Sequence, residues 1–162
     1  GTVTVKEYSN QARIVEARAD IGVYSPVSVI KAALNKAQES DLVFMDSPPG
    51  ISCPFIAAVV PADFIVLVTE PTPFGLNDLK LSVETLEQLD KPFGVVVNRT
   101  GLGDERVYAW LEEKQIPLLM KIPFDKNIAR IYSQSQLLVN EVPAYAGPFG
   151  NLLKTIEQLC KK

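Results

Sequence analysis

Asp46 is the residue of this chain whose setting most clearly suggests chemistry. It follows the apolar run Leu42–Met45 and precedes a Ser-Pro-Pro-Gly turn that ends at Gly50. An uninterrupted apolar run bounded by a turn predicts a strand over 41–46, covered on both faces as in a parallel α/β sheet. Such sheets bind ligands beyond the carboxyl ends of their strands. Asp46 is therefore a candidate to hold Mg²⁺ or its bound water, while the amide of Gly50 can approach a phosphate closely. An ordinary strand exit with a solvated Asp46 fits the same pattern.

The composition limits the classes of protein to consider. At 162 residues, with 47% hydrophobic and 22% charged residues, the chain resembles one soluble globular domain. Its net charge of −3, without a long basic run, argues against nucleic acid and anionic membranes as partners. No segment approaches the roughly 20 apolar residues of a membrane helix. The absence of histidine removes Ser-His, Cys-His and His-metal chemistry. No signal peptide opens the chain, and the two cysteines, Cys53 and Cys160, lie far apart without C-x-x-C spacing, which argues against a disulfide scaffold, so we expect a cytoplasmic protein.

Segments of strand and helix character alternate along the chain. Besides the strand at 41–46, the patterns predict a hairpin within 1–20, strands at 64–69, 93–97 and 117–122, and helices at 25–39, 76–86, 107–111, 128–132 and 149–159. This alternation predicts an α/β fold, namely a doubly wound, mostly parallel sheet with helices on both faces. The strand ends at Asp46, Asn98 and Pro123 should then line one edge of the sheet.

Four strings occur here in the order in which they occur in MinD/ParA-type P-loop ATPases. They are Asp46–Gly50, Thr69–Thr72, Val97–Arg99 and Ile122–Asp125. The chain resembles in particular the members with an inserted ferredoxin domain, where D-x-P-P-G-x-x-C-P and T-E-P-T-P-F-G strings are typical. The resemblance covers most of the chain from about residue 14. It implies an ATP-binding, P-loop NTPase-like fold.

The resemblance assigns roles at the phosphate end of an ATP site. Asp46 would be the switch acid that contacts Mg²⁺ through water and serves catalysis, and Gly50 would face the γ-phosphate. In this superfamily ATP lies between two subunits, so a homodimer around the nucleotide is implied. Mg²⁺ and lysine charges would stabilise the transferring phosphoryl group while water attacks.

The resemblance also assigns roles at the base end. Asn98, with Arg99 beside it, would recognise the adenine edge, because an Asn side chain offers both a donor and an acceptor. Three residues would wall the base: Pro123, Phe124 and Asp125. Alternatively, Asn98 forms a turn after a strand and Pro123 ends the next one.

One departure from the superfamily matters more than these matches. The phosphate loop, a variant of G-x-x-x-x-G-K-[ST], should precede Asp46, but no Gly-Lys pair occurs in the sequence. The first strand, its phosphate loop and the ferredoxin insert have no counterpart here. We therefore expect residues 1–162 to be the C-terminal portion of a longer ATPase, with the hairpin of residues 1–20 following the insert.

Cys53 allows two interpretations. It follows Asp46 by the same offset as a cysteine of the related nitrogenase iron protein that helps to hold a [4Fe–4S] cluster, so it is a candidate cluster ligand. The commoner fate of an unpaired cysteine is burial as a small apolar residue, and this interpretation is favoured.

Two functions of different classes follow from the sequence. The first is the nucleotide-binding part of a MinD-like ATPase, associated in its full form with iron–sulfur clusters and with a redox or metallocluster-related partner. The second is a non-catalytic α/β module that binds a partner or serves as a scaffold. The missing phosphate loop favours the second for this chain taken alone.

Overall fold

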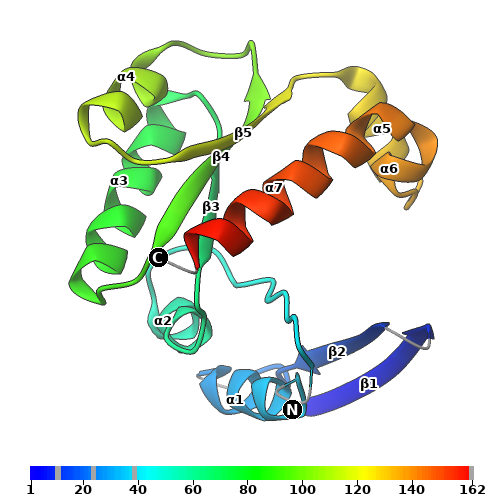
Figure 1. The fold of residues 1–162 in the computed structure, drawn as a ribbon. Coiled ribbons are helices and arrows are strands. Elements are labelled where there is room, and N and C mark those ends of the chain that lie inside the picture. Colours follow the sequence, from blue (N-terminus) through cyan, green and yellow to red (C-terminus); the bar gives the residue numbers. More distant parts are fainter. Residues whose placement is uncertain (10–11, 23–24, 38–39, 161–162) are drawn as a thin grey trace. The chain divides into compact units, whose positions relative to one another are not determined.

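The computed structural model describes residues 1–9, 12–22, 25–37 and 40–160. The chain divides into two compact units, residues 1–62 and residues 63–162 (Figure 1). Each unit is described by itself. None of the helices formed by the described residues has the length and apolar character needed to cross a membrane.

The first unit is built from a hairpin and two helices. Strands β1 (Thr2–Ser9) and β2 (Ala12–Arg18) pair antiparallel, with the Lys6 ammonium 3.3 Å from the Glu16 carboxylate. Helix α1 (Val27–Ala37) packs against β2 and against helix α2 (Cys53–Val59). Helix α1 begins two residues later than predicted, because the Pro26 carbonyl accepts its first helical hydrogen bonds. The Ser25 hydroxyl oxygen still accepts a hydrogen bond from the Val27 amide, at 3.4 Å.

The prediction of a strand over residues 41–46 is wrong. Residues 43–48 adopt no regular secondary structure, and the side chain of Phe44 is 75% exposed. A strand requires a neighbour whose backbone N–H and C=O groups pair with its own. Among the described residues of this unit only β1 and β2 form a sheet, and they pair with each other. Asp46 and Gly50 therefore lie in an extended loop and turn, not at the end of a strand.

The second unit contains the parallel sheet. Strands β3 (Ile65–Thr69), β4 (Phe93–Thr100) and β5 (Leu118–Pro123) are arranged in the order β3-β4-β5. The helical segments between and after them are α3 (Pro73–Gln88), α4 (Arg106–Glu113), α5 (Lys126–Ser133), α6 (Leu138–Glu141), the 3-10 turn η1 (Pro143–Tyr145) and α7 (Ala146–Leu159). Helices α3 and α4 lie on one side of the sheet and α7 on the other (Figure 1). The predicted α/β fold with helices on both faces is confirmed.

Strand β4, the middle strand of the sheet, forms the centre of the core of this unit. Val95 and Val97 are fully buried, because neighbouring strands and helices cover both faces of β4. Edge strand β3 differs. It buries Ile65 and Leu67 but leaves Val66 37% and Val68 65% exposed. Strand β4 is thus covered on both faces, whereas β3 is covered on one face only.

Candidate functional site

The predicted base-binding residues lie at a β-bulge where β4 ends. Val97 pairs with Lys121 and Thr100 with Pro123, so β4 advances three residues while β5 advances two. One residue of β4 is therefore extra, as in a β-bulge, a device that redirects side chains at the rim of a sheet. Arg99 has a φ of 54°, in the left-handed region that a residue with a Cβ rarely adopts.

Two hydrogen bonds hold the backbone of this bulge. The Asn98 side-chain oxygen accepts from the Arg99 amide at 2.9 Å, and the Arg99 carbonyl accepts from the Leu102 amide at 3.2 Å. The turn-forming role considered for Asn98 is therefore real. This hydrogen bond uses one lone pair of the Asn98 Oδ1 atom. The second lone pair and both Nδ2 protons have no partner among the described residues. Asn98 can thus shape the turn and still present a donor and an acceptor.

Glu70, which follows β3, contacts the bulge from the neighbouring strand. Its Oε1 atom lies 3.2 Å from Nη1 of Arg99, with the side chains 41% and 55% exposed, respectively. Sequence analysis assigned no role to Glu70. The parallel register, which pairs Thr69 with Val97, could have indicated this contact, because it carries the residues after both strands to the same edge.

Two glycines allow close backbone approaches at this edge, Gly75 within the connection after β3 and Gly103 between the loops after β4 and β3. A Cβ on Gly75 would lie 2.4 Å from the Glu70 carbonyl oxygen, and a Cβ on Gly103 would lie 1.7 Å from the Pro71 carbonyl oxygen. The same Pro71 oxygen accepts a hydrogen bond from the Asp104 amide at 3.0 Å. The loops after β3 and β4 are therefore joined through backbone atoms at spacings that a side chain would prevent.

The predicted wall residues begin at the end of β5. Pro123 is the last residue of the strand, the Phe124 amide donates to the Thr100 carbonyl at 2.9 Å, and the Phe124 side chain is 44% exposed. Asp125 has a definite structural role, because its Oδ1 caps helix α5 by accepting from the Asn127 amide at 2.7 Å. The structure thus brings the predicted base-end residues, joined by Glu70, to one edge of the sheet.

Charged groups beside this edge are already paired. Arg106 donates from Nε and Nη2 to Oδ2 of Asp104, at 2.9 and 2.6 Å. These hydrogen bonds lower the pKa of the Asp104 carboxyl and raise the pKa of the Arg106 guanidinium. Asp104 is therefore a structural anion of the loop before α4 and a weak candidate for a general base.

The predicted switch residues lie in the first unit. Asp46 is exposed, and its carboxylate has no hydrogen bond or ion pair to any other described residue. Gly50 has a φ of 86°, and a Cβ there would meet nothing within 4 Å. A free carboxylate beside an open turn fits a hydrated metal ion and a phosphate, although it equally fits the solvated exit considered from sequence.

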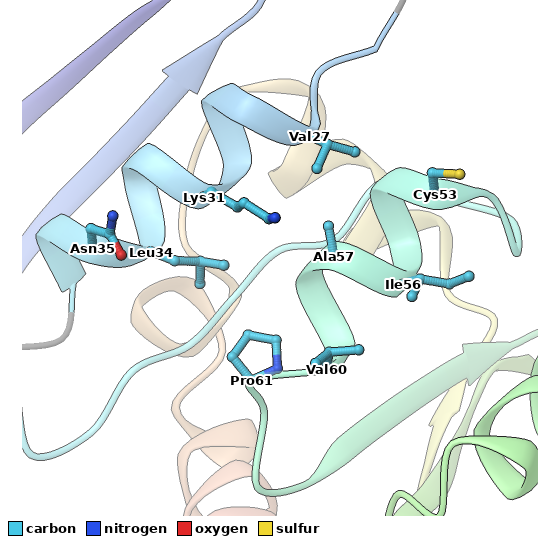
Figure 2. A pocket seen from close by; sticks show the side chains of 9 residues that line it. All are labelled: Val27, Lys31, Leu34, Asn35, Cys53, Ile56, Ala57, Val60 and Pro61. Atoms are coloured by element: carbon cyan, nitrogen blue, oxygen red, sulfur yellow. The ribbon is translucent and has the colours of Figure 1, made fainter.

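Cys53 lines an open apolar hollow between α1 and α2. The hollow has a volume of about 550 Å³, and in Figure 2 the side chains of Lys31 and Leu34 extend from α1 toward α2, which carries Ala57. Its lining comprises Val27, Lys31, Leu34, Asn35, Cys53, Ile56, Ala57, Val60 and Pro61.

The favoured interpretation of Cys53 as a buried residue is wrong, because its side chain is exposed. Cys53 is the first residue of α2, whereas the helix buries Phe55, Ala58 and Val59. Among the described residues, no three His, Cys, Asp or Glu side chains are grouped so that they could hold a metal ion. Cys53 is thus reachable for a cluster but has no second ligand beside it in the described part of the chain.

Solved structures share the architecture of this chain. The cell division ATPase MinD of Pyrococcus furiosus is 25% identical, with a TM-score of 0.67 over 83% of this chain and 59% of that chain. The fold is MinD-like. A chain of the MinC:MinD cell division protein complex from Aquifex aeolicus is 20% identical, with a TM-score of 0.64 over 81% of this chain and 59% of that chain.

Curated relatives match as well. An uncharacterized protein of Methanocaldococcus jannaschii is 31% identical over 93% of this chain and 54% of its own length. An uncharacterized ATP-binding protein of the same organism is 27% identical over 64% of this chain and 41% of its own length. The chain with its MinD-like fold thus spans about half the length of these relatives. No protein-family model matches the chain.

Proposed function

We propose that this chain is part of a MinD/ParA-type ATPase, in which it supplies the switch residues and the adenine side of the ATP site. The observation that carries this proposal is the bulge of β4, where Asn98 keeps a free donor and acceptor at the same sheet edge as Pro123 and Phe124. The MinD-like fold and the relative named as ATP-binding support the same proposal.

At the base end, recognition would depend on the Asn98 amide. A purine edge pairs a donor with an acceptor, which the Asn98 side chain can match while its oxygen still accepts from the Arg99 amide. Pro123 would limit the pocket by its fixed backbone, and the half-exposed ring of Phe124 offers an apolar surface to the base. Asp125 would act indirectly, by fixing the start of α5.

At the phosphate end, the proposal assigns Asp46 to the water shell of Mg²⁺ and the Gly50 amide to the γ-phosphate. The free carboxylate and the open turn fit these groups. Bound Mg²⁺ would neutralise the phosphate charge that develops during phosphoryl transfer. Asp46 would hold the water of the metal, and Gly50 would position the terminal phosphate.

We propose that the phosphate-binding loop comes from another segment of a longer protein, of which this chain is the C-terminal portion. No Gly-Lys pair occurs in the sequence. Among the described residues β3 pairs with β4 alone, and Val66 and Val68 are exposed on one face of β3. An edge strand with an apolar, uncovered face is suited to pairing with a further strand. Such a strand could carry the missing phosphate loop.

Partners and clusters belong to the proposal for the whole protein. For the whole protein we propose a homodimer around ATP and a protein partner, and the likeness to a MinC:MinD complex supports the proposed partner. The ferredoxin-insert subtype, its [4Fe–4S] clusters and a redox partner rest on the strings at 46–54 and 69–75. Exposed Cys53 is the one residue of this chain that we assign as a candidate cluster ligand.

A non-catalytic partner-binding module is the second candidate, and the lack of a Gly-Lys pair favours it. Binding of adenosine, which carries no phosphate, separates the two functions. We expect adenosine at millimolar concentration to shift the amide resonances of residues 98–102 and 123–125. Asn98→Ala should abolish the shifts, whereas Asn140→Ala, an exposed Asn of α6, should leave them unchanged. The same spectra without any shift in the unaltered chain would favour the partner-binding module.

Titration calorimetry of this chain with Mg-ATP tests whether its phosphate-binding loop is missing. Because the phosphate loop supplies most of the phosphate contacts, we expect weak binding or none, and no hydrolysis above background. Micromolar affinity would show that this chain contains a phosphate site that its sequence does not reveal.

Asp46→Asn tests the switch assignment in the complete protein. The variant should fold normally, since Asp46 is exposed, yet lose ATP turnover by a factor equivalent to several kcal/mol at the transition state. Asp41→Asn, an exposed acid of the same loop, is the matched control. Unchanged turnover in Asp46→Asn would identify Asp46 as a solvated loop residue.

A further inference from the structure

We infer that Glu70 is a positioning residue, which acts through Arg99 to hold the bulge of β4 in the conformation that presents Asn98 to a base. This inference rests on the proposed function of the bulge. Its central observation is the ion pair between the Glu70 carboxylate and the Arg99 guanidinium at 3.2 Å, which joins the ends of two neighbouring strands.

The bulge needs such support because its backbone is unfavourable. Arg99 lies in the left-handed region at a φ of 54°, where its Cβ crowds the backbone. The hydrogen bonds from the Arg99 amide to Asn98 and from the Leu102 amide to Arg99 are both local. Backbone pairing holds the bulge to β5 on one side, where the Phe124 amide donates to the Thr100 carbonyl at 2.9 Å. The pair with Glu70 connects the Arg99 side chain to the strand on the other side, β3, and so adds a second attachment.

Glu70 can serve as a support because its own backbone is held. Thr69 is buried and donates from its hydroxyl to the Gly75 carbonyl at 3.0 Å, while the Thr72 hydroxyl accepts from the Gly75 amide at 3.0 Å. Gly75 lies so close to the Glu70 carbonyl that a Cβ would be 2.4 Å from it. The first turn of α3 therefore closes on the exit of β3 and fixes the origin of the Glu70 side chain.

This arrangement gives the T-E-P-T-P-F-G string a physical explanation that sequence analysis could not supply. Thr69, Thr72 and Gly75 fix the turn, and Glu70 transmits its position to Arg99 across the sheet. The string would then belong to the base-binding edge, although none of its residues needs to touch the nucleotide.

The test compares Glu70→Gln, Arg99→Gln and the double variant with Glu84→Gln, an exposed acid of α3 that has no ion pair among the described residues. Dissociation constants for adenosine and for guanosine come from the amide shifts of residues 98–102. We expect Glu70→Gln to weaken adenosine binding about threefold, in line with an exposed ion pair, and to reduce the preference for adenosine over guanosine. Arg99→Gln should do the same, and the double variant should add nothing further.

The outcomes separate this inference from the function on which it rests. If the unaltered chain does not respond to adenosine, the proposed function fails. If it responds but Glu70→Gln behaves as Glu84→Gln does, or if the effects of Glu70→Gln and Arg99→Gln add, the positioning role is overturned. Thermal unfolding of each variant controls for loss of fold. Glu70→Asp is the second variant should Glu70→Gln fail to fold, and it should show a smaller loss in the same direction.

Discussion

Two apolar runs of this chain, Leu42–Met45 and Ile65–Val68, have similar composition, and each leads into a proline-containing turn. Only the second is a strand. Ile65 and Leu67 are buried in the second unit, whereas Phe44 in the first unit is 75% exposed. Local propensity is much the same in the two runs, so it cannot explain the difference.

Backbone pairing explains it. Strand β3 pairs in register with β4, from Ile65 beside Phe93 to Thr69 beside Val97, and α3 packs against it. The run at 42–45 has no such neighbour among the described residues of its unit. An apolar run therefore shows that a segment can be a buried strand, but a hydrogen-bonding partner decides whether it becomes one.

The largest expected effect comes from removing the same side chain from each run. Leu67→Ala should lower the free energy of unfolding of the second unit by about 2–4 kcal/mol, because Leu67 is buried. Leu42→Ala should change the stability of the first unit by less than about 0.5 kcal/mol, because Leu42 is 53% exposed. Urea titrations followed by amide resonances of each unit measure both values. Equal losses would mean that the first run is packed in solution, and the comparison would fail.

A second pair of variants compares the turns. Gly103→Ala should destabilise the second unit by about 2 kcal/mol or more, because its Cβ would collide with the Pro71 carbonyl. Gly50→Ala should cost the first unit only about 1 kcal/mol, since its Cβ meets nothing and the positive φ alone is unfavourable. Gly147→Ala in α7, where a Cβ has open space, is the control and should be neutral or stabilising. Thermal unfolding ranks the three variants by their loss of stability. A larger loss in Gly50→Ala than in Gly103→Ala would show that the space around Gly50 is not open.

The smallest expected effect is on the pH dependence of stability, to which one exposed carboxylate in each unit contributes. Hydrogen bonds from Arg18 and Lys6 lower the pKa of Glu16, and hydrogen bonds from Arg106 lower the pKa of Asp104. A pKa that is lower in the folded state contributes stability above the unfolded-state pKa. That stability is lost as the pH falls through the folded pKa. Both contributions should therefore disappear in the acid range below the ordinary values of 4.5 for Glu16 and 3.8 for Asp104.

Carboxyl carbon titrations by NMR measure these shifts. Arg106→Gln should raise the pKa of Asp104 toward its ordinary value, because it removes the side-chain hydrogen bonds that lower it most, while the amide of residue 106 still donates to Oδ1 of Asp104. Lys6→Gln should leave the pKa of Glu16 lowered, because Arg18 contributes the larger part. A normal pKa of Asp104 in the unaltered chain would show that the Arg106 contact does not persist in solution.

The sequence by itself determined the α/β alternation of the second unit. The predicted strands at 64–69, 93–97 and 117–122 match β3, β4 and β5 closely, and the apolar spacing of residues 76–86 located the buried face of α3. Parallel strands end at a common edge, so the placement of Asn98 and Pro123 at one edge also followed from the pattern, whereas the third strand end predicted there, Asp46, is not part of a strand. These features depend on residue type and period alone, which any stretch of sequence displays locally.

Tertiary structure alone decided the rest. It left residues 43–48 without a strand and Cys53 exposed, and it shaped the bulge that places Arg99 against Glu70. Each of these outcomes depends on a partner that lies far along the chain or is missing from the described residues: a neighbouring strand, a covering surface, or an ion-pair partner. A pattern along the sequence cannot specify such partners, because pairing, burial and bulge register are set by which segments meet in space.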